Sequence, residues 1–303
     1  MLLQRSSALD SSPQTGRFIK VGNDNIFIQE TGPSSGPAVF FIHGTGSWSE
    51  LWKPEMSRLS SLGFYCIALD LPPFGFSFPK EGESFRYARK SQAQSIIDVL
   101  DALNIKKVTL VGHSFGGRAT LTTALMIPSR IDRLILVNIA LSFGPKPDIL
   151  NPSKPPIWLQ FALENEFLRS TFAAIGTFPP LTKAFVSMFV ADPSKVTSDV
   201  IRMYQRPLGV TGKTRQMGDW LKEFLLSTEN ELVINQDLFK DFAAPTDVIW
   251  GDLDTVTLLW QGEEIKKRFK TAHLHTINNV GHLPMIEAPE SFHATISEIL
   301  NRP

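Results

Sequence analysis

Residues 108–127 read VTLVGHSFGGRATLTTALMI, and this stretch decides the fold. The apolar run at 108–111 has the composition of a buried strand. It leads directly into the pattern G-x-S-x-G around Ser114, and a helix-compatible segment follows. In this order of strand, turn and helix, a sharp turn lifts the serine hydroxyl above the sheet, and Gly112 and Gly116 leave room for neighbouring backbone. The helix N-terminus then favours negative charge beside the hydroxyl. We therefore predict that Ser114 is a nucleophile.

Other apolar runs alternate with helical patterns along the chain. The apolar residues at 93, 96, 97, 100 and 103 follow the helical spacing, as do those at 292, 296, 299 and 300. Strands that are apolar throughout are typical of a parallel sheet covered on both faces, so the sequence predicts an α/β fold with helices on both faces. The predicted strands are residues 18–21 and 26–29, which form a hairpin, and then 38–42, 64–69, 108–111, 134–137, 248–250 and 273–277.

Between residues 141 and 235 this alternation stops. Prolines at 145, 147, 152, 155 and 156 open the interval, and helix-like stretches rich in Phe, Trp and Met follow. We interpret 141–235 as a mostly helical insertion into a core of residues 17–140 and 236–303. Residues 1–16 are polar and Ser-rich, which predicts a flexible N-terminal extension. The aromatic residues of the insertion are candidates for its own core and for the lining of an apolar substrate pocket. The candidates for substrate contact are Trp158, Phe161, Phe185 and Met188.

Ser114 needs a base, because a serine hydroxyl is a weak nucleophile on its own. Among six histidines, His282 stands in a loop after the last predicted strand, at the edge where the sites of parallel sheets assemble. The base in turn needs a carboxylate, and Asp254 follows the strand 248–250, which gives the chain order Ser, Asp, His. Asp252 is the competing candidate, although it could instead hold the loop. We predict a catalytic group of Ser114, Asp254 and His282.

Acyl transfer through Ser114 also needs hydrogen-bond donors for a negatively charged oxygen. The backbone N–H of Phe115, directly after the nucleophile, is one candidate. The backbone N–H of Thr45, in the loop after the strand 38–42, is the other. The alternative is that His43–Gly46 forms only a tight turn.

Charge and composition exclude several classes of protein. The chain has 30 Lys and Arg against 30 Asp and Glu, so no basic excess is available for a nucleic acid backbone. Its single cysteine cannot form an internal disulfide or a Cys-rich metal site. Gly212-Lys213-Thr214 resembles the end of a phosphate-binding loop, but Pro207 stands where that motif needs a glycine. We predict a small-molecule substrate, with no cofactor, no metal and no nucleic acid partner.

Targeting and membrane signals are weak. The first apolar run stops at Leu3, whereas a signal peptide needs a longer one, so we predict a cytoplasmic protein. The longest nearly apolar stretch, 171–191, is interrupted by Pro179, Pro180 and Lys183, which disfavours a spanning helix. Docking of this stretch on a membrane surface is a less favoured alternative. The sequence makes no prediction of the oligomeric state.

Taken together, these motifs resemble those of the α/β-hydrolase fold superfamily. The resemblance implies an eight-stranded, mostly parallel sheet whose second strand is antiparallel, with the insertion as a helical cap. Pro73 and Thr257 depart from the residues usual in this family, and we expect neither to touch a catalytic atom. The resemblance rests on His43–Gly46, Asp70–Ser77, Gly112–Gly117, Gly251–Asp254 and Gly281-His282, which occur in the family's order.

The residues and the resemblance together predict a serine esterase that acts on a small, largely apolar substrate through an acyl-enzyme. Ser114 argues against epoxide hydrolases and haloalkane dehalogenases, which resemble this chain elsewhere but use Asp at that position. Three alternatives stay open. One is hydrolysis of a carbon–carbon bond in a diketone-like substrate. The second is an amidase or aminopeptidase, in which Glu164 and Glu166 would hold a substrate amine. The third is a ligand receptor on the same fold.

Overall fold

Among the residues that the computed structural model describes, which are 6–79, 87–140, 156–226, 239 and 241–302, eight strands form one sheet. Their spatial order is β1-β2-β4-β3-β5-β6-β7-β8. The strand β2 is antiparallel to both of its neighbours, and all other pairs are parallel. The strands are β1 (Gly16–Val21), β2 (Asp24–Thr31), β3 (Ala38–Ile42), β4 (Tyr65–Leu69), β5 (Val108–His113), β6 (Ile131–Val137), β7 (Thr246–Gly251) and β8 (Ala272–Ile277).

The predicted sheet is confirmed, including the antiparallel second strand and the hairpin that joins β1 to β2. Each predicted apolar run lies within or overlaps one of these strands. The helices are α1 (Ala8–Ser11), α2 (Lys53–Ser61), α3 (Arg89–Ala102), α4 (Ser114–Met126), α5 (Ile157–Glu164), α6 (Glu166–Gly176), α7 (Thr182–Ser187), α8 (Ser198–Gln205), α9 (Lys213–Leu226), α10 (Leu259–Arg268), α11 (Pro284–Glu287) and α12 (Pro289–Asn301).

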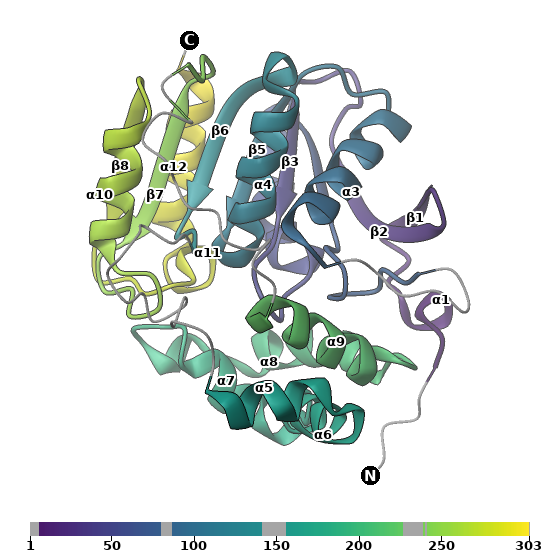
Figure 1. The fold of residues 1–303 in the computed structure, drawn as a ribbon. Helices are drawn as coiled ribbons and strands as arrows, with labels where there is room; N and C mark the ends of the chain where they lie inside the picture. Colours follow the sequence, from purple (N-terminus) through teal and green to yellow (C-terminus); the bar gives the residue numbers. More distant parts are fainter. Residues whose placement is uncertain (1–5, 80–86, 141–155, 227–238, 240, 303) are drawn as a thin grey trace.

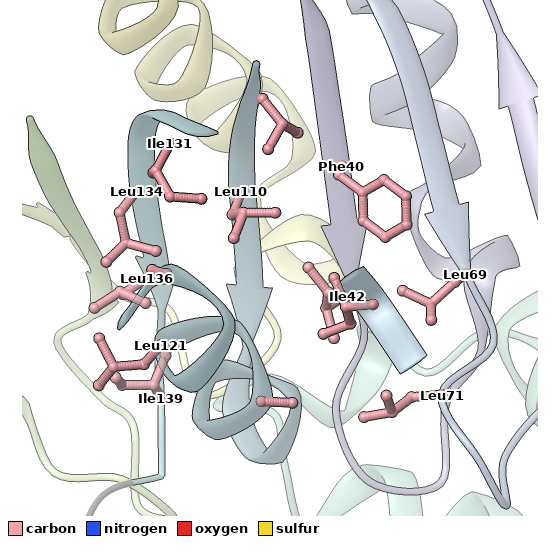
Figure 2. Packing of buried hydrophobic residues seen from close by; sticks show 14 of the residues in the cluster. Phe40, Ile42, Leu69, Leu71, Leu110, Leu121, Ile131, Leu134, Leu136 and Ile139 are labelled. Carbon is pink, nitrogen blue, oxygen red and sulfur yellow. The ribbon is translucent and has the colours of Figure 1, made fainter. Parts of the chain in front are cut away.

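Helices cover both faces of the sheet, because successive residues of each buried strand point to opposite sides. In β3, Phe40 and Ile42 pack with residues of α3, α4 and α10, whereas Val39 and Phe41 pack with residues of α2 and α12. Figure 2 shows the first of these layers, where Phe40 and Ile42 lie in the same packed layer as Leu110 of β5. Continuous apolar strands are therefore required here, since neither face meets water.

The helices α5 to α9, which we call the insert (residues 156–226), come between β6 and β7 in the chain. They lie beyond the carboxyl ends of the central strands, with α9 nearer the sheet and α6 farther from it (Figure 1). The predicted boundaries of the insertion, at residues 141 and 235, fall outside the described residues, as do its opening prolines up to position 155. The described part of the interval is helical, as the sequence predicted.

Of the N-terminal extension predicted over residues 1–16, the structure describes residues 6–16, and part of it contacts the insert. The Ser6 carbonyl accepts a hydrogen bond from Thr211 N at 3.0 Å, and Ala8 is buried beside Val210. The Ser7 hydroxyl accepts from Asp10 N at 3.1 Å and caps α1. The serines that suggested disorder thus act as a helix cap and a backbone partner, which composition alone does not reveal.

Candidate active site

The nucleophile turn joins β5 directly to α4. Ser114 has φ +50°, in the left-handed region, so its backbone holds the side chain in a strained turn. A Cβ at Gly116 would lie 2.1 Å from the carbonyl oxygen of His43, and one at Gly112 would lie 2.2 Å from the Thr120 hydroxyl. The crowding predicted for both glycines is therefore present. It comes from backbone at Gly116 and from a side chain at Gly112.

Ser114, His282 and Asp254 form a chain of hydrogen bonds. The Ser114 Oγ lies 2.7 Å from His282 Nε2, and His282 Nδ1 lies 2.7 Å from Asp254 Oδ2. The ionised Asp254 carboxylate accepts a hydrogen bond from Nδ1–H of His282, which leaves Nε2 of the neutral imidazole free to accept the serine proton. All three side chains are buried. Asp252 lies elsewhere, with Oδ1 accepting from Val280 N at 3.3 Å, so it holds the loop.

Asp254 is surrounded by donors that the sequence analysis missed. Its Oδ2 accepts from Asn138 Nδ2 at 2.5 Å and from Thr257 Oγ1 at 2.6 Å. Its Oδ1 accepts from the backbone N–H groups of Val256 and Thr257. Burial acts to raise the Asp254 pKa, but the hydrogen bonds and the charge of His282 outweigh it, so the pKa lies below its ordinary value. The carboxylate is therefore held ionised.

Thr257 corrects an expectation, since it contacts Asp254 and His282. Its Oγ1 also lies 3.2 Å from His282 Nδ1. Asn138 follows β6 at the same edge of the sheet as Ser114 and has φ +43°. Its position directly after a buried strand was a signal that could have marked it, because polar residues at carboxyl ends of parallel strands meet at one edge.

The loop that carries His282 is fastened to the insert. The His282 N–H donates to the Phe189 carbonyl at 2.9 Å. Glu287 Oε1 accepts from Gly281 N at 2.9 Å, and its Oε2 accepts from Ala191 N at 2.7 Å. Burial raises the Glu287 pKa, while these N–H donors lower it in part. One carboxylate thus connects the segment between α7 and α8 of the insert to the histidine loop.

Two other histidines support the site without titrating near neutral pH. His113 Nε2 lies 2.8 Å from the His282 carbonyl, and burial, together with His282, lowers the His113 pKa to about 3. His43 Nε2 accepts from Leu71 N at 2.9 Å, which places the ring proton on Nδ1, 2.8 Å from the Gly44 carbonyl. Burial lowers the His43 pKa to about 4. Both rings are therefore neutral, and their hydrogen bonds connect neighbouring loops.

The predicted N–H donors both lie at the cavity beside the serine. Thr45 and Phe115 line the same cavity as Ser114 and His282. Phe115 is in the first turn of α4, where backbone N–H groups have no acceptor within the helix. This arrangement allows two N–H groups to approach an oxygen attached to a carbon that Ser114 attacks.

The cavity has a volume of about 340 Å³. It lies between the insert and the carboxyl ends of the strands with the loops that follow them, which we call the sheet edge. Of the predicted substrate contacts, Phe185 lines it, but Trp158, Phe161 and Met188 do not. These three side chains are 64%, 67% and 70% exposed. A helix presents its aromatic residues to several sides, so composition did not indicate which ones face inward. The insert residues that line the cavity include Phe172, Phe189, Tyr204, Met217, Leu221 and Phe224.

One cation stands among the described residues that line the cavity, and no carboxylate does. This cation is Lys213, at the start of α9, which is 2% exposed. Its Nζ donates to the Pro73 carbonyl at 2.7 Å, and burial lowers its pKa to about 7. Asp70 accepts from the N–H groups of Ser49 and Phe76, and burial raises its pKa to about 6. The sequence had marked Lys213 only as part of a false phosphate-binding motif.

Comparison with known proteins gives the family. The family model for the alpha/beta hydrolase fold matches residues 37–289. The chain belongs to the alpha/beta hydrolase fold family. This hydrolase is 25% identical to the 2-hydroxy-6-oxo-2,4-heptadienoate hydrolase of Pseudomonas putida, over 95% of this chain and 96% of the relative.

Solved structures of the same fold include proteins of different named activities. The 2-hydroxy-6-oxo-6-phenylhexa-2,4-dienoate hydrolase from Rhodococcus sp. superposes with a TM-score of 0.75 at 20% identity, over 95% of this hydrolase and 98% of that chain. An esterase from Exiguobacterium antarcticum superposes with a TM-score of 0.73 at 20% identity, over 95% and 100%. The fold alone therefore does not choose between these substrates.

One alternative from the sequence, the amidase or aminopeptidase, and the expectation on membrane-spanning helices can be compared with the structure of this hydrolase. Glu164 and Glu166 are exposed and do not line the cavity, and Glu164 pairs with Lys222 at 2.6 Å. They are therefore not positioned to hold a substrate amine in the cavity. Within the described part of the chain, no helix is long and apolar enough to cross a membrane.

Proposed function

We propose that this hydrolase cleaves a carboxylic ester of a small, largely apolar compound through an acyl-enzyme, with Ser114, His282 and Asp254 as the catalytic residues. The observation that carries the proposal is the hydrogen-bonded chain of these three side chains at the wall of a mainly aromatic and aliphatic cavity. We also propose that the insert acts as a cap, because its residues form much of the cavity wall.

In the proposed mechanism, His282 Nε2 takes the Ser114 proton while Oγ attacks the ester carbonyl carbon. The oxygen that becomes negative accepts hydrogen bonds from the N–H groups of Thr45 and Phe115. The imidazolium, stabilised by Asp254, then protonates the leaving alcohol, and the acyl group stays on Ser114. Water repeats the sequence on the acyl-enzyme: His282 takes its proton, and the same proton returns to Ser114 as the acid departs.

A second candidate is hydrolysis of a carbon–carbon bond beside a ketone. It is favoured by the relatives named as hydrolases of 2-hydroxy-6-oxo-dienoates and by Lys213, the cation in the cavity wall, since such a substrate carries a carboxylate. The apolar character of the remaining lining favours the ester. Binding without catalysis is the third reading, in which Ser114 would stay unreactive.

The deciding experiment compares aryl esters of increasing acyl length with a 2-hydroxy-6-oxo-dienoate, using wild type and Ser114→Ala. We expect kcat/KM to be higher for the esters, to rise with acyl length, and to fall about 10⁴- to 10⁶-fold in the variant. Labelling of wild type by a fluorophosphonate, absent in the variant, reports the reactive serine directly. Higher kcat/KM for the dienoate would replace the ester by the second candidate. Unlabelled wild type with no turnover would favour a receptor.

A further inference from the structure

The outer side of α6 and α7 exposes a set of apolar side chains, which we call the α6–α7 face. Ile175 is 54% exposed, Phe178 is 53% exposed, and Leu181 is 45% exposed. Met188, at the end of α7, and Phe172 complete the set. Single exposed apolar residues are common, but several exposed apolar side chains within one short segment favour a surface that contacts something apolar.

The charged residues within the segment that carries this face are of one sign. Residues 167–191 contain no Asp or Glu, and their two cations are Arg169 and Lys183. Arg169 is paired with Asp219 at 3.0 Å, so Lys183, which is exposed, is the cation that remains for a partner. A segment with exposed apolar side chains, no carboxylate and an exposed lysine suits the boundary of a lipid bilayer, where tails accept the apolar groups and phosphates accept the cation.

The α6–α7 face and the cavity are two sides of the same helices. Ala173 and Thr177 are buried and line the cavity from α6, while Ile175 and Phe178 point outward. Phe172 belongs to both, because it lines the cavity and is 38% exposed. Figure 1 places α6 at the end of the molecule away from the sheet, where a flat surface can meet it.

We propose that the α6–α7 face docks this hydrolase on a lipid bilayer surface, with the cavity opening beside the lipid. The apolar side chains enter the boundary between headgroups and tails, and Lys183 stays at the level of the phosphates. An apolar substrate dissolved in the bilayer then passes Phe172 without crossing bulk water. A second copy of the chain on this face is the competing occupant, and it would leave the exposed Lys183 without an anionic partner from residues 167–191 of that copy.

The test measures partition of the protein onto sedimented vesicles, without substrate, so that it does not depend on the proposed chemistry. The vesicles are phosphatidylcholine with a minority of phosphatidylglycerol, or phosphatidylcholine alone. We expect wild type to bind both and I175S/F178S/L181S to bind at least about tenfold less, since each serine removes apolar area from the bilayer. The matched control is L62S/M126S, which changes exposed apolar residues on the core and should bind as wild type does.

Lys183→Gln measures the electrostatic contribution to vesicle binding. We expect this variant to bind about fivefold less to the anionic vesicles and to lose little binding to the neutral ones. None of the residues changed lines the cavity, so hydrolysis of a dissolved aryl ester should be unchanged and serves as the check of folding. The proposal is overturned if wild type stays in the supernatant. It is also overturned if the triple variant and its control lose vesicle binding to the same extent. A wild-type dimer that the triple variant converts to monomer assigns the face to a second copy instead.

Discussion

The sheet edge and the insert contribute to the same cavity by different physical means. At the sheet edge, Ser114 follows β5 directly, and Asp254 and His282 stand in the loops after β7 and β8. Their positions are fixed by strand register, by tight backbone approach and by hydrogen bonds of 2.7 Å. The insert instead places aromatic side chains by helix packing. The difference suggests that the edge determines which bond is attacked, whereas the insert determines which molecule is admitted.

The variant with the largest expected effect on kcat tests the sheet edge alone. Asp254→Asn replaces an ionised acceptor by an amide that cannot hold His282 in the tautomer with a proton on Nδ1, so kcat should fall about 10⁴-fold. KM should change little, because Asp254 does not line the cavity. Steady-state kinetics on an aryl ester give both values. Asp252→Asn is the matched control and should keep kcat within about threefold; a similar loss in both variants would mean that loop order, not the tautomer, was disturbed.

Glycine-to-alanine substitutions at two positions compare how closely atoms pack around the backbone in the two regions. The Cβ of Gly116→Ala would meet the His43 carbonyl at 2.1 Å, so the free energy of unfolding should fall by about 3 kcal/mol. Gly176, the last residue of α6, has nothing within 4 Å of an added Cβ. Gly176→Ala should leave the free energy of unfolding unchanged or raise it by about 0.5 kcal/mol. Urea unfolding measures both, and equal losses would contradict the contrast between a crowded edge and an open insert.

What the sequence could predict follows the same division. Local patterns specify strands and turns, so the sheet and the positions of Ser114, Asp254 and His282 could be predicted from runs of apolar residues and the glycines between them. Asn138 and Thr257 act through contacts with Asp254 that no short motif encodes. Their partners come together only when the ends of β6 and β7 are adjacent.

Which side chains of the insert line the cavity could not be predicted, for a different reason. Phe185 lines the cavity and Trp158 does not, although both are aromatic residues on predicted helices. Which face of a helix points inward depends on packing against neighbours, such as α6 against α9, where Gly218 and Ala173 meet. The contact of Ala8 with Val210 of the insert likewise joins residues that lie far apart in the chain.

Thr257→Val tests one hydrogen bond at the sheet edge. It removes a donor to the Asp254 carboxylate and keeps the shape of the side chain at position 257. A buried acceptor that loses a hydrogen bond should cost about 10- to 100-fold in kcat, and Thr257→Ser should restore most of it. Without this donor the Asp254 pKa rises, so activity should be lost at a higher pH on the acid side than in wild type. The measurement is the pH profile of kcat. A loss that Thr257→Ser does not recover would indicate a packing role for the methyl group.

A change with pH, rather than a loss at one pH, tests where the two regions join. Burial lowers the Lys213 pKa to about 7 from 10.5, so between these pH values the unfolded chain binds more protons than the folded protein. The free energy of unfolding should therefore rise with pH across that window, by up to about 1.4 kcal/mol per pH unit. Asp70 acts in the opposite sense: its pKa is raised to about 6 from 3.8, so its contribution falls as pH rises between these values.

Lys213→Met should remove the rise above pH 7, whatever it does to the absolute stability through the lost bonds to Pro73 and Ser77. Lys222→Met, at a lysine of the same helix that pairs with Glu164 on the surface, is the control and should keep the wild-type slope. Urea unfolding at several pH values gives the slopes. If the rise persists in Lys213→Met, the Lys213 ammonium is not the desolvated group that makes stability depend on pH at this junction.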